Sequence, residues 1–526
     1  MIGTSLPEYV FIRTSIFFLQ YTTPICVSSL LVHVAIAGKK VAFSWPGGLV
    51  AAYALLDGLY ALCIYYPHNR RLKQAAEHPP LQPRSERRAL FQRCLDNTPD
   101  PAAYLRLWFL GADESEIQKE NLHEFFSWAF LDKHPGNETA AEQKELDEYI
   151  AETERRIGHR LQPGRGKAKS LRLTLDDIDV QYRSVIWYLI VWGVDLITHI
   201  QLSRQEFQYY AQPRPHSSFV VPPRLQSLFP EKRSISQLSY WYRPHTAKDK
   251  LPLVFLHGIG IGLWPYTEYL SYLNEGRAED DQIGIIAIEY LPVSMRFTNA
   301  PLTREEFLSQ ITLLIDAHGW DQFALLGHSY GTALATSMLK SPELNPRIQS
   351  VVLVDPISIL LHLPDIAYNF TRRKPRRANE YLLWYFASTD PGAAHCLGRH
   401  FFWKDNIAWK EDLLQITGNP PAKESTAKLE GSGLRKVAVC LAERDLIVDT
   451  PTVWRYLAND ENWMSAGDIV YKDGTQQSLA KPQGGRLENN GIEIVWFDGL
   501  DHAQAFDRKE TSARLAAVTR RICTQN

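Results

Sequence analysis

The chain has 526 residues, of which 45% are hydrophobic, and its formal net charge at pH 7 is −2. This length allows two or three domains with a large core, and a nearly neutral chain does not favour nucleic acid as a partner. Its 6 cysteines follow no recognisable spacing, which argues against a disulfide framework or a zinc site and favours a reducing compartment.

Two apolar segments predict a membrane-anchoring region over residues 1–75. Residues 15–37 contain no Asp, Glu, Lys or Arg, and they are long enough to cross a bilayer as a helix. Residues 41–66 have aromatic residues at both ends, as membrane spans do, although Asp57 and a Pro-Gly-Gly triplet weaken this second prediction. A hydrophobic helical hairpin packed on the protein is the alternative, and one or two spans remain open.

Basic residues decide the expected orientation of the anchor. Arg70, Arg71 and Lys73 follow the second apolar segment, and positive charge is retained on the cytoplasmic side of membrane spans. We therefore expect an intracellular membrane protein whose catalytic part faces the cytoplasm.

Residues 76–211 are predicted to form a helical accessory region, with helices over residues 86–95 and 140–157 rich in Glu, Arg, Ala and Leu. Near its end, residues 185–194 form an apolar run that Asp195 closes. That run is too short to span a bilayer comfortably. It is either a core helix or an interfacial segment, and its two tryptophans favour the interface.

Residues 212–526 are predicted to form an α/β domain with a mostly parallel sheet. Helical stretches, notably residues 303–317, separate short apolar runs, and this alternation indicates a parallel sheet covered on both faces. Its active site should lie at the carboxyl ends of the strands. The predicted strands are residues 234–242, 253–256, 284–288, 323–326, 351–354, 437–441 and 492–497.

The fourth of these strands runs into Gly327-His328-Ser329-Tyr330-Gly331, and a helical segment follows. Strand, Gly-x-Ser-x-Gly and helix together predict a nucleophile elbow, in which a strained turn raises the serine hydroxyl above the sheet. An incidental serine between a buried strand and a helix is the alternative. Ser329 is therefore the candidate nucleophile.

A glycine-rich loop follows the strand at residues 253–256 and begins with His257-Gly258-Ile259. In this fold such a loop lies beside the nucleophile, so backbone amides of Gly258 and Ile259, with that of Tyr330, are candidates to hold an oxyanion. A phosphate-binding loop is the alternative, but it lacks the Gly-Lys-Ser/Thr ending.

The candidate acid and base follow the last two strands. Asp445 comes after residues 437–441, where an acid can orient an imidazole, and His502 comes after residues 492–497. Asp449 competes with Asp445, unless it caps a helix before Pro451. Asp355, after residues 351–354, is a further acid candidate.

A predicted lid insert covers residues 356–436, after the strand ending near Val354. Aromatic residues at 381–386 and 401–403 could line an acyl pocket or form the core of the lid. Residues 372–377 form a basic cluster that either touches anionic lipid headgroups or belongs to a solvated loop or to intramolecular salt bridges.

From about residue 209 to 507 the chain resembles the α/β-hydrolase superfamily of serine esterases and lipases. More narrowly, residues 363–370 with the basic cluster, and Leu500-Asp501-His502-Ala503-Gln504, resemble fungal membrane-associated α/β-hydrolase-like proteins. The chain order Ser329, Asp445, His502 is that of the superfamily triad. The resemblance implies a nucleophile, an acid and a base at these three positions, although Glu443 stands where many relatives have Gly.

These features predict a membrane-anchored serine hydrolase that cleaves a carboxylic ester of a lipophilic substrate through an acyl-enzyme. We expect no cofactor and no metal, a small-molecule or lipid ester as substrate, and no nucleic acid as partner. An acyltransferase or thioesterase using the same residues is one alternative. A catalytically inactive, membrane-tethered binding protein is the other.

Overall fold

A sheet of ten strands forms the centre of the molecule in the computed structural model, which describes residues 3–38, 45–213, 220–228, 230, 232–416, 434–458, 486–489 and 491–524. Its strand order is β2-β1-β3-β5-β4-β6-β7-β8-β10-β9. The strands are β1 (Gln208–Ala211), β2 (Lys232–Arg233), β3 (Ser239–Arg243), β4 (Leu253–Leu256), β5 (Ile285–Glu289), β6 (Phe323–His328), β7 (Ile348–Val354), β8 (Lys436–Ala442), β9 (Arg486–Asn489) and β10 (Ile492–Phe497).

The strands from β5 to β10 in this order are parallel, whereas β3 pairs antiparallel with β5 and β9 pairs antiparallel with β10. The predicted mostly parallel sheet is therefore confirmed. Its central strands are buried along both faces, which explains why they read as unbroken apolar runs in the sequence.

The sheet begins differently from the prediction. Residues 234–242 do not form one strand, because β2 ends at Arg233 and β3 starts at Ser239. Two serine hydroxyls accept hydrogen bonds from nearby amides in between, Ser234 from Ser236 N at 3.0 Å and Ser236 from Leu238 N at 3.2 Å. Such local side-chain bonds compete with strand pairing and turn the chain. The short outer strands β1, β2 and β9 were not predicted.

Helices cover both faces of the sheet. One apolar core joins the sheet to α11 (Arg304–Ala317), α12 (Tyr330–Leu339) and α18 (Thr450–Ala458), and the other joins it to α10 (Thr267–Tyr272) and α19 (Lys509–Ile522). Successive strand residues alternate between the two cores, as the pleat requires. Val254 contributes to the first core and Phe255 to the second.

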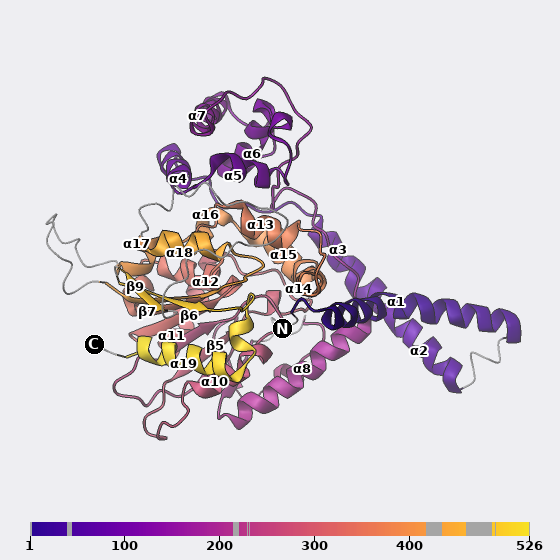
Figure 1. The fold of residues 1–526 in the computed structure, drawn as a ribbon. Helices are drawn as coiled ribbons and strands as arrows, with labels where there is room; N and C mark the ends of the chain where they lie inside the picture. Colours follow the sequence, from indigo (N-terminus) through magenta and orange to yellow (C-terminus); the bar gives the residue numbers. More distant parts are fainter. Residues whose placement is uncertain are drawn as a thin grey trace.

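The insert after β7 is helical where the structure describes it. It contains α13 (Pro364–Thr371), α14 (Ala378–Leu383), the π-helical turn η8 (Trp384–Ser388), α15 (Pro391–His400), α16 (Trp403–Asn406) and α17 (Lys410–Leu414). Figure 1 shows this layer between the sheet and the accessory helices α4–α7. Those helices are α4 (Arg84–Asp96), α5 (Pro101–Trp108), α6 (Lys119–Leu131) and α7 (Ala140–Ile157), so the two predicted accessory helices are confirmed.

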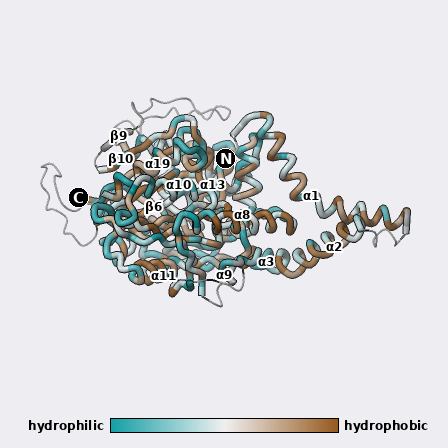
Figure 2. Tube along the Cα trace, turned by 90° about the horizontal axis from the view of Figure 1, so that it is seen from below, coloured by the Kyte–Doolittle hydropathy of each residue, from teal (hydrophilic) through white to brown (hydrophobic). Residues whose placement is uncertain are grey.

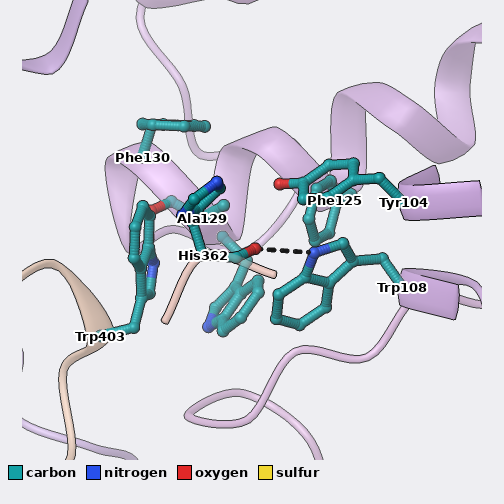
Figure 3. Close-up of a pocket in the computed structure, with 8 residues that line it drawn as sticks. Tyr104, Trp108, Phe125, Ala129, Phe130, His362 and Trp403 are labelled. Atoms are coloured by element: carbon teal, nitrogen blue, oxygen red, sulfur yellow. Dashed lines mark hydrogen bonds between the residues drawn. The ribbon is translucent and has the colours of Figure 1, made fainter. Parts of the chain in front are cut away.

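An aromatic joint connects the accessory helices to the insert. Figure 3 shows the small cavity of about 10 Å³ at this joint, lined mostly by aromatic rings. The Trp108 indole donates to the His362 carbonyl at 3.2 Å, and the Trp403 indole donates to the Ala129 carbonyl at 3.0 Å. The cavity has room for about one water molecule, so we interpret it as a packing joint rather than a substrate pocket.

Within the described residues, three helices are long and apolar enough to cross a membrane by length and composition: α1 (Leu6–Ala37), the α2–α3 segment between Trp45 and Leu72, and α8 (Val185–Arg204). The middle segment comprises α2 (Trp45–Tyr60), the π-helical turn η2 (Ala61–Tyr65) and α3 (Tyr66–Leu72). Figures 1 and 2 show α1 and α2 projecting from the body of the molecule as an apolar hairpin.

Two charged residues in the apolar segments pair with the body of the protein. The buried Asp57 carboxylate accepts hydrogen bonds from Tyr182 Oη and Val185 N, both at 2.7 Å. Asp195 contacts two buried arginines, Arg224 and Arg296. The prediction that the apolar run ends at Asp195 is wrong, because α8 extends to Arg204. The ion pairs neutralise the Asp195 charge within the helix.

Candidate active site

Ser329 lies at the sharp turn between β6 and α12. Its backbone angles are φ 50° and ψ −120°, a conformation that costs a non-glycine residue free energy and is common at functional sites. The flanking glycines allow the turn. A Cβ atom on Gly327 would lie 2.7 Å from the Gly331 carbonyl oxygen, and one on Gly331 would lie 2.2 Å from the Leu256 carbonyl oxygen.

The structure brings Ser329, His502 and Asp445 together at the carboxyl ends of β6, β10 and β8. His502 Nε2 lies 2.9 Å from Ser329 Oγ, and His502 Nδ1 lies 2.7 Å from Asp445 Oδ2. The other carboxylate oxygen, Asp445 Oδ1, accepts the amides of Ile447 at 2.8 Å and Val448 at 2.9 Å. A carboxylate fixed in this way can orient the imidazole towards the serine hydroxyl.

The two competing acids have other partners. Asp449 accepts hydrogen bonds from Thr452 N at 3.3 Å and Thr452 Oγ1 at 2.7 Å, as expected of a residue capping the start of α18. Asp355 accepts the amides of Ala442 at 3.1 Å and Ala503 at 2.7 Å. Asp355, Asp445 and His502 have potential metal-ligand atoms within 4.8 Å of one another. Both carboxylates, however, already accept hydrogen bonds from protein groups.

The carboxylates around His502 change its proton affinity. Burial alone disfavours the imidazolium ion, but the charge and hydrogen bond of Asp445 outweigh burial, and Asp355 and Asp501 add to the effect, which raises the His502 pKa to about 9. The imidazolium that forms when His502 accepts a proton is therefore well stabilised.

The loop after β4 packs directly against the elbow. A Cβ atom on Gly258 would lie 2.9 Å from Ser329 Cβ. The Gly258 amide donates to Tyr266 Oη at 3.1 Å, and the same phenol lies 2.8 Å from His328 Nδ1. The amide of Gly258 is thus directed at Tyr266. The other two oxyanion candidates are Ile259, next in the loop, and Tyr330, whose amide lies in the first helical turn, where backbone donors have no intrahelical acceptor.

Tyr266 and His328 were not identified from the sequence as part of the site. His328 occupies a variable position of the Gly-x-Ser-x-Gly motif, so the motif gave its place but no role. Nothing in the sequence connects Tyr266 to the elbow, because the contact depends on how the loop after β4 folds back.

The insert contacts the acid loop with part of its basic cluster. Arg373 Nη1 donates to the Leu446 carbonyl at 2.9 Å, and Arg372 Nη2 lies 3.3 Å from Asp176 Oδ2. Arg373 thus makes an intramolecular hydrogen bond and Arg372 an intramolecular salt bridge. Intramolecular contacts of this kind were the expected alternative to contact with lipid headgroups. Of the aromatic residues, Tyr385 is fully buried, so it belongs to the core of the insert.

Comparison with protein-family profiles identifies one family that agrees with this architecture. The profile of the alpha/beta hydrolase family matches residues 253–515. A search of curated proteins gives no match.

Three of the similar solved structures share 11% or 12% sequence identity with the chain. A membrane phospholipase A, described as a bacterial virulence factor, has a TM-score of 0.36 at 11% identity and covers 64% of this chain and 94% of its own. Naproxen esterase from Bacillus subtilis has a TM-score of 0.34 at 12% identity, covering 64% and 97%. An epoxide hydrolase from Vigna radiata has a TM-score of 0.32 at 11% identity, covering 54% and 94%.

The family match extends from β4, which precedes the glycine-rich loop, into α19 and includes Ser329, Asp445 and His502. It covers half of the sequence, and the sheet and the elbow have the form that this match requires. The chain belongs to the alpha/beta hydrolase family.

Proposed function

We propose that this protein is a membrane-anchored serine hydrolase that cleaves a carboxylic ester of a lipophilic substrate. The observation that supports it most strongly is the hydrogen-bonded chain from Ser329 through His502 to Asp445, with the serine on a strained turn. A strained serine next to a base that a buried carboxylate orients is the arrangement required for nucleophilic catalysis.

The proposed reaction has two halves. Ser329 Oγ attacks the ester carbonyl while His502 Nε2 takes its proton, and the amides of Tyr330 and Ile259 hold the oxyanion. His502 then gives the proton to the departing alcohol, which leaves Ser329 as an acyl-enzyme. Water, deprotonated by His502, attacks this ester, and the acid product is released as the proton returns to Ser329.

The proposal of a lipophilic substrate rests on the apolar hairpin and on the aromatic residues of the insert. Transfer of the acyl group to an alcohol, amine or thiol, or hydrolysis of a thioester, would use the same residues. Product analysis with competing acceptors separates hydrolysis from transfer, because a transferase forms the new ester, amide or thioester in preference to the free acid.

A fluorophosphonate probe tests whether the protein is a serine hydrolase at all. The probe phosphonylates an activated serine with loss of fluoride, and we expect mass spectrometry of the labelled full-length protein to place one adduct on Ser329. Absence of labelling, with the protein folded, would favour the inactive binding protein. An adduct on another serine would contradict the assignment of the nucleophile.

The anchor is tested by alkaline carbonate extraction of the full-length protein. Side chains on the hairpin such as Leu31 and Ile36 are 65% and 81% exposed, and covering an apolar side chain stabilises the protein by about 1.5–3 kcal/mol. We expect the protein to stay in the membrane pellet. Release into the soluble fraction would show that the hairpin is covered by protein instead of lipid.

The same membranes allow the orientation to be measured. Arg70 and Arg71 lie in the last turn of α3, at the end of the hairpin nearer the catalytic domain. Positive charges there favour the cytoplasmic side, so added protease should digest the catalytic domain in sealed vesicles whose cytoplasmic face is outward.

A further inference from the structure

The short helix α14 touches the His502 loop through one side chain. Asn379 Nδ2 donates to Asp501 Oδ2 at 2.5 Å. The other carboxylate oxygen of Asp501 accepts the His502 amide at 2.7 Å and the Leu446 amide at 2.9 Å. Asp501 therefore joins the backbone of the base loop to that of the acid loop, and Asn379 holds Asp501 from the insert.

A second pair of side chains, on or just after α13, holds the acid loop directly. Asn369 Nδ2 donates to the Ile447 carbonyl at 2.9 Å, and Arg373 Nη1 donates to the Leu446 carbonyl at 2.9 Å. Arg373 also donates to Asn369 Oδ1, which fixes the two side chains relative to each other. The amides of Ile447 and Val448 are the ones that hold the Asp445 carboxylate. The base of the insert is thus bonded to the loop that orients His502.

The opposite side of α14 carries the first turns of α1. Ile12 and Ile16, which are 2% and 4% exposed, pack in one apolar cluster with Ala378. The Arg13 guanidinium lies 4.3 Å from the centre of the Tyr381 ring. These residues precede the exposed part of α1, so the helix docks on α14 before it leaves the body of the molecule (Figure 1).

From these contacts we infer that α14 links the N-terminal helix to the catalytic centre, with Asn379 as a positioning residue for His502. The inference rests on the proposed function, because it assigns Asn379 a role in the geometry of the Ser329–His502 pair. The insert is accordingly a fixed part of the site at its α13–α14 base, and it cannot swing away there as a lid without releasing the acid loop.

Removing the Asn379 amide should mainly affect the chemical step. Asp501 is 8% exposed, so a carboxylate oxygen that loses its donor gains little from water. A hydrogen bond to a charged group contributes about 1.5–3 kcal/mol. If this whole contribution helps to orient the His502 imidazole, its loss should lower kcat by roughly 10-fold to 100-fold. Asn379 is assigned no contact with substrate, so we expect kcat to fall while KM for a short-chain soluble ester stays the same.

The first experiment uses the full-length protein in detergent micelles, after labelling has established that Ser329 is the nucleophile. Asn379→Ala is compared with Asn406→Ala, a matched variant in the same insert whose side-chain amide donates to the Phe402 carbonyl at 2.8 Å. We expect kcat to fall about 10-fold or more for Asn379→Ala alone, and Asn379→Ser, which keeps a donor, to recover part of it. Equal kcat values for Asn379→Ala and wild type, or an equal fall in Asn406→Ala, would overturn the positioning role.

The second experiment tests the connection to α1 with a double-mutant cycle. Ile16→Ala should lower kcat through α14, whereas Leu31→Ala, on the exposed part of the same helix, should not. The double variant Ile16→Ala/Asn379→Ala should show a smaller fall in kcat than the product of the falls in the two single variants, because both substitutions act through α14. The milder Ile16→Val gives the same comparison if the alanine variant folds poorly.

Two outcomes would contradict the link to α1. One is an unchanged kcat in both Ile16 variants, and the other is full additivity with Asn379→Ala. Failure of the proposed function has a different signature, since the wild-type protein would then show no labelling at Ser329 and no ester hydrolysis to compare.

Discussion

Ser329→Ala is expected to lower kcat for ester hydrolysis by on the order of 10⁶-fold, the size of effect known for loss of a serine nucleophile. Without Oγ no acyl-enzyme can form, so fluorophosphonate labelling should disappear as well. The fold should survive, because alanine retains the Cβ and the backbone of the turn is set by its glycine neighbours. Steady-state kinetics, probe labelling and thermal unfolding of the same preparation measure the three quantities.

Ser350→Ala is the matched control for this variant. Ser350 is a buried serine in the adjacent strand β7, with 1% exposure, and no part of the proposed mechanism uses it. Activity and labelling should remain within a few-fold of wild type. Substantial hydrolysis by Ser329→Ala would show that another group is the nucleophile. If Ser329→Ala does not fold, Ser329→Cys, which changes the shape of the side chain less, can be used to separate catalysis from stability.

Asp445→Asn is expected to lower kcat by on the order of 10⁴-fold, as when the acid of a serine–histidine–aspartate triad becomes an amide. Asparagine can present its NH₂ group to His502 Nδ1, which favours the tautomer that carries its proton on Nε2. That nitrogen then cannot accept the proton of Ser329, which explains a large loss from an almost isosteric change.

The pH dependence of the Asp445→Asn variant provides a second signature. His502 must be neutral to act as a base, so wild-type kcat/KM should rise with pH and level off above the His502 pKa of about 9. Asp445 is the main group that raises this pKa, and without its charge burial lowers it. The acidic limb of the pH profile should therefore move to lower pH in Asp445→Asn, although the plateau is far lower.

Asp449→Asn distinguishes the two acids of the loop. Asp449 bonds to Thr452 at the start of α18, and asparagine is an equally good capping residue. Its pH profile and kcat should match those of the wild type. A large loss in Asp449→Asn combined with a normal Asp445→Asn would reverse the assignment of the acid.

The sheet was predictable because its strands are buried on both faces. A strand such as β4 has no polar side to present to water, so its sequence becomes a short apolar run, and this run was predicted with the bounds that the structure shows. Where local chemistry competed with pairing, prediction failed. The serines before β3 shorten one expected strand, which begins at Ser239 instead of residue 234, and the ion pairs of Asp195 lengthen one expected helix.

The candidate site was predictable to the extent that it consists of strand ends. Parallel strands bring their carboxyl ends to one edge of the sheet, so Ser329, Asp445 and His502 could be expected to meet although they lie far apart in the chain. Their separations, and the preference of His502 for Asp445 over Asp355, depend on loop conformations that no periodicity encodes. The position of Tyr266 also depends on a loop conformation. Its hydroxyl accepts a hydrogen bond from the Gly258 amide, which was one of the three amides expected to bind the oxyanion.

The sequence by itself therefore determined the family, the elbow and the chain order of the candidate nucleophile, acid and base, because strained turns and buried strands require particular residue types at fixed spacing. Only the tertiary structure decided what surrounds them. Asn379 and Asp501 are ordinary polar residues in the sequence, and they meet because the insert packs over the acid loop. Contacts between distant segments arise from the packing of whole elements, so single residues carry no local signal for them.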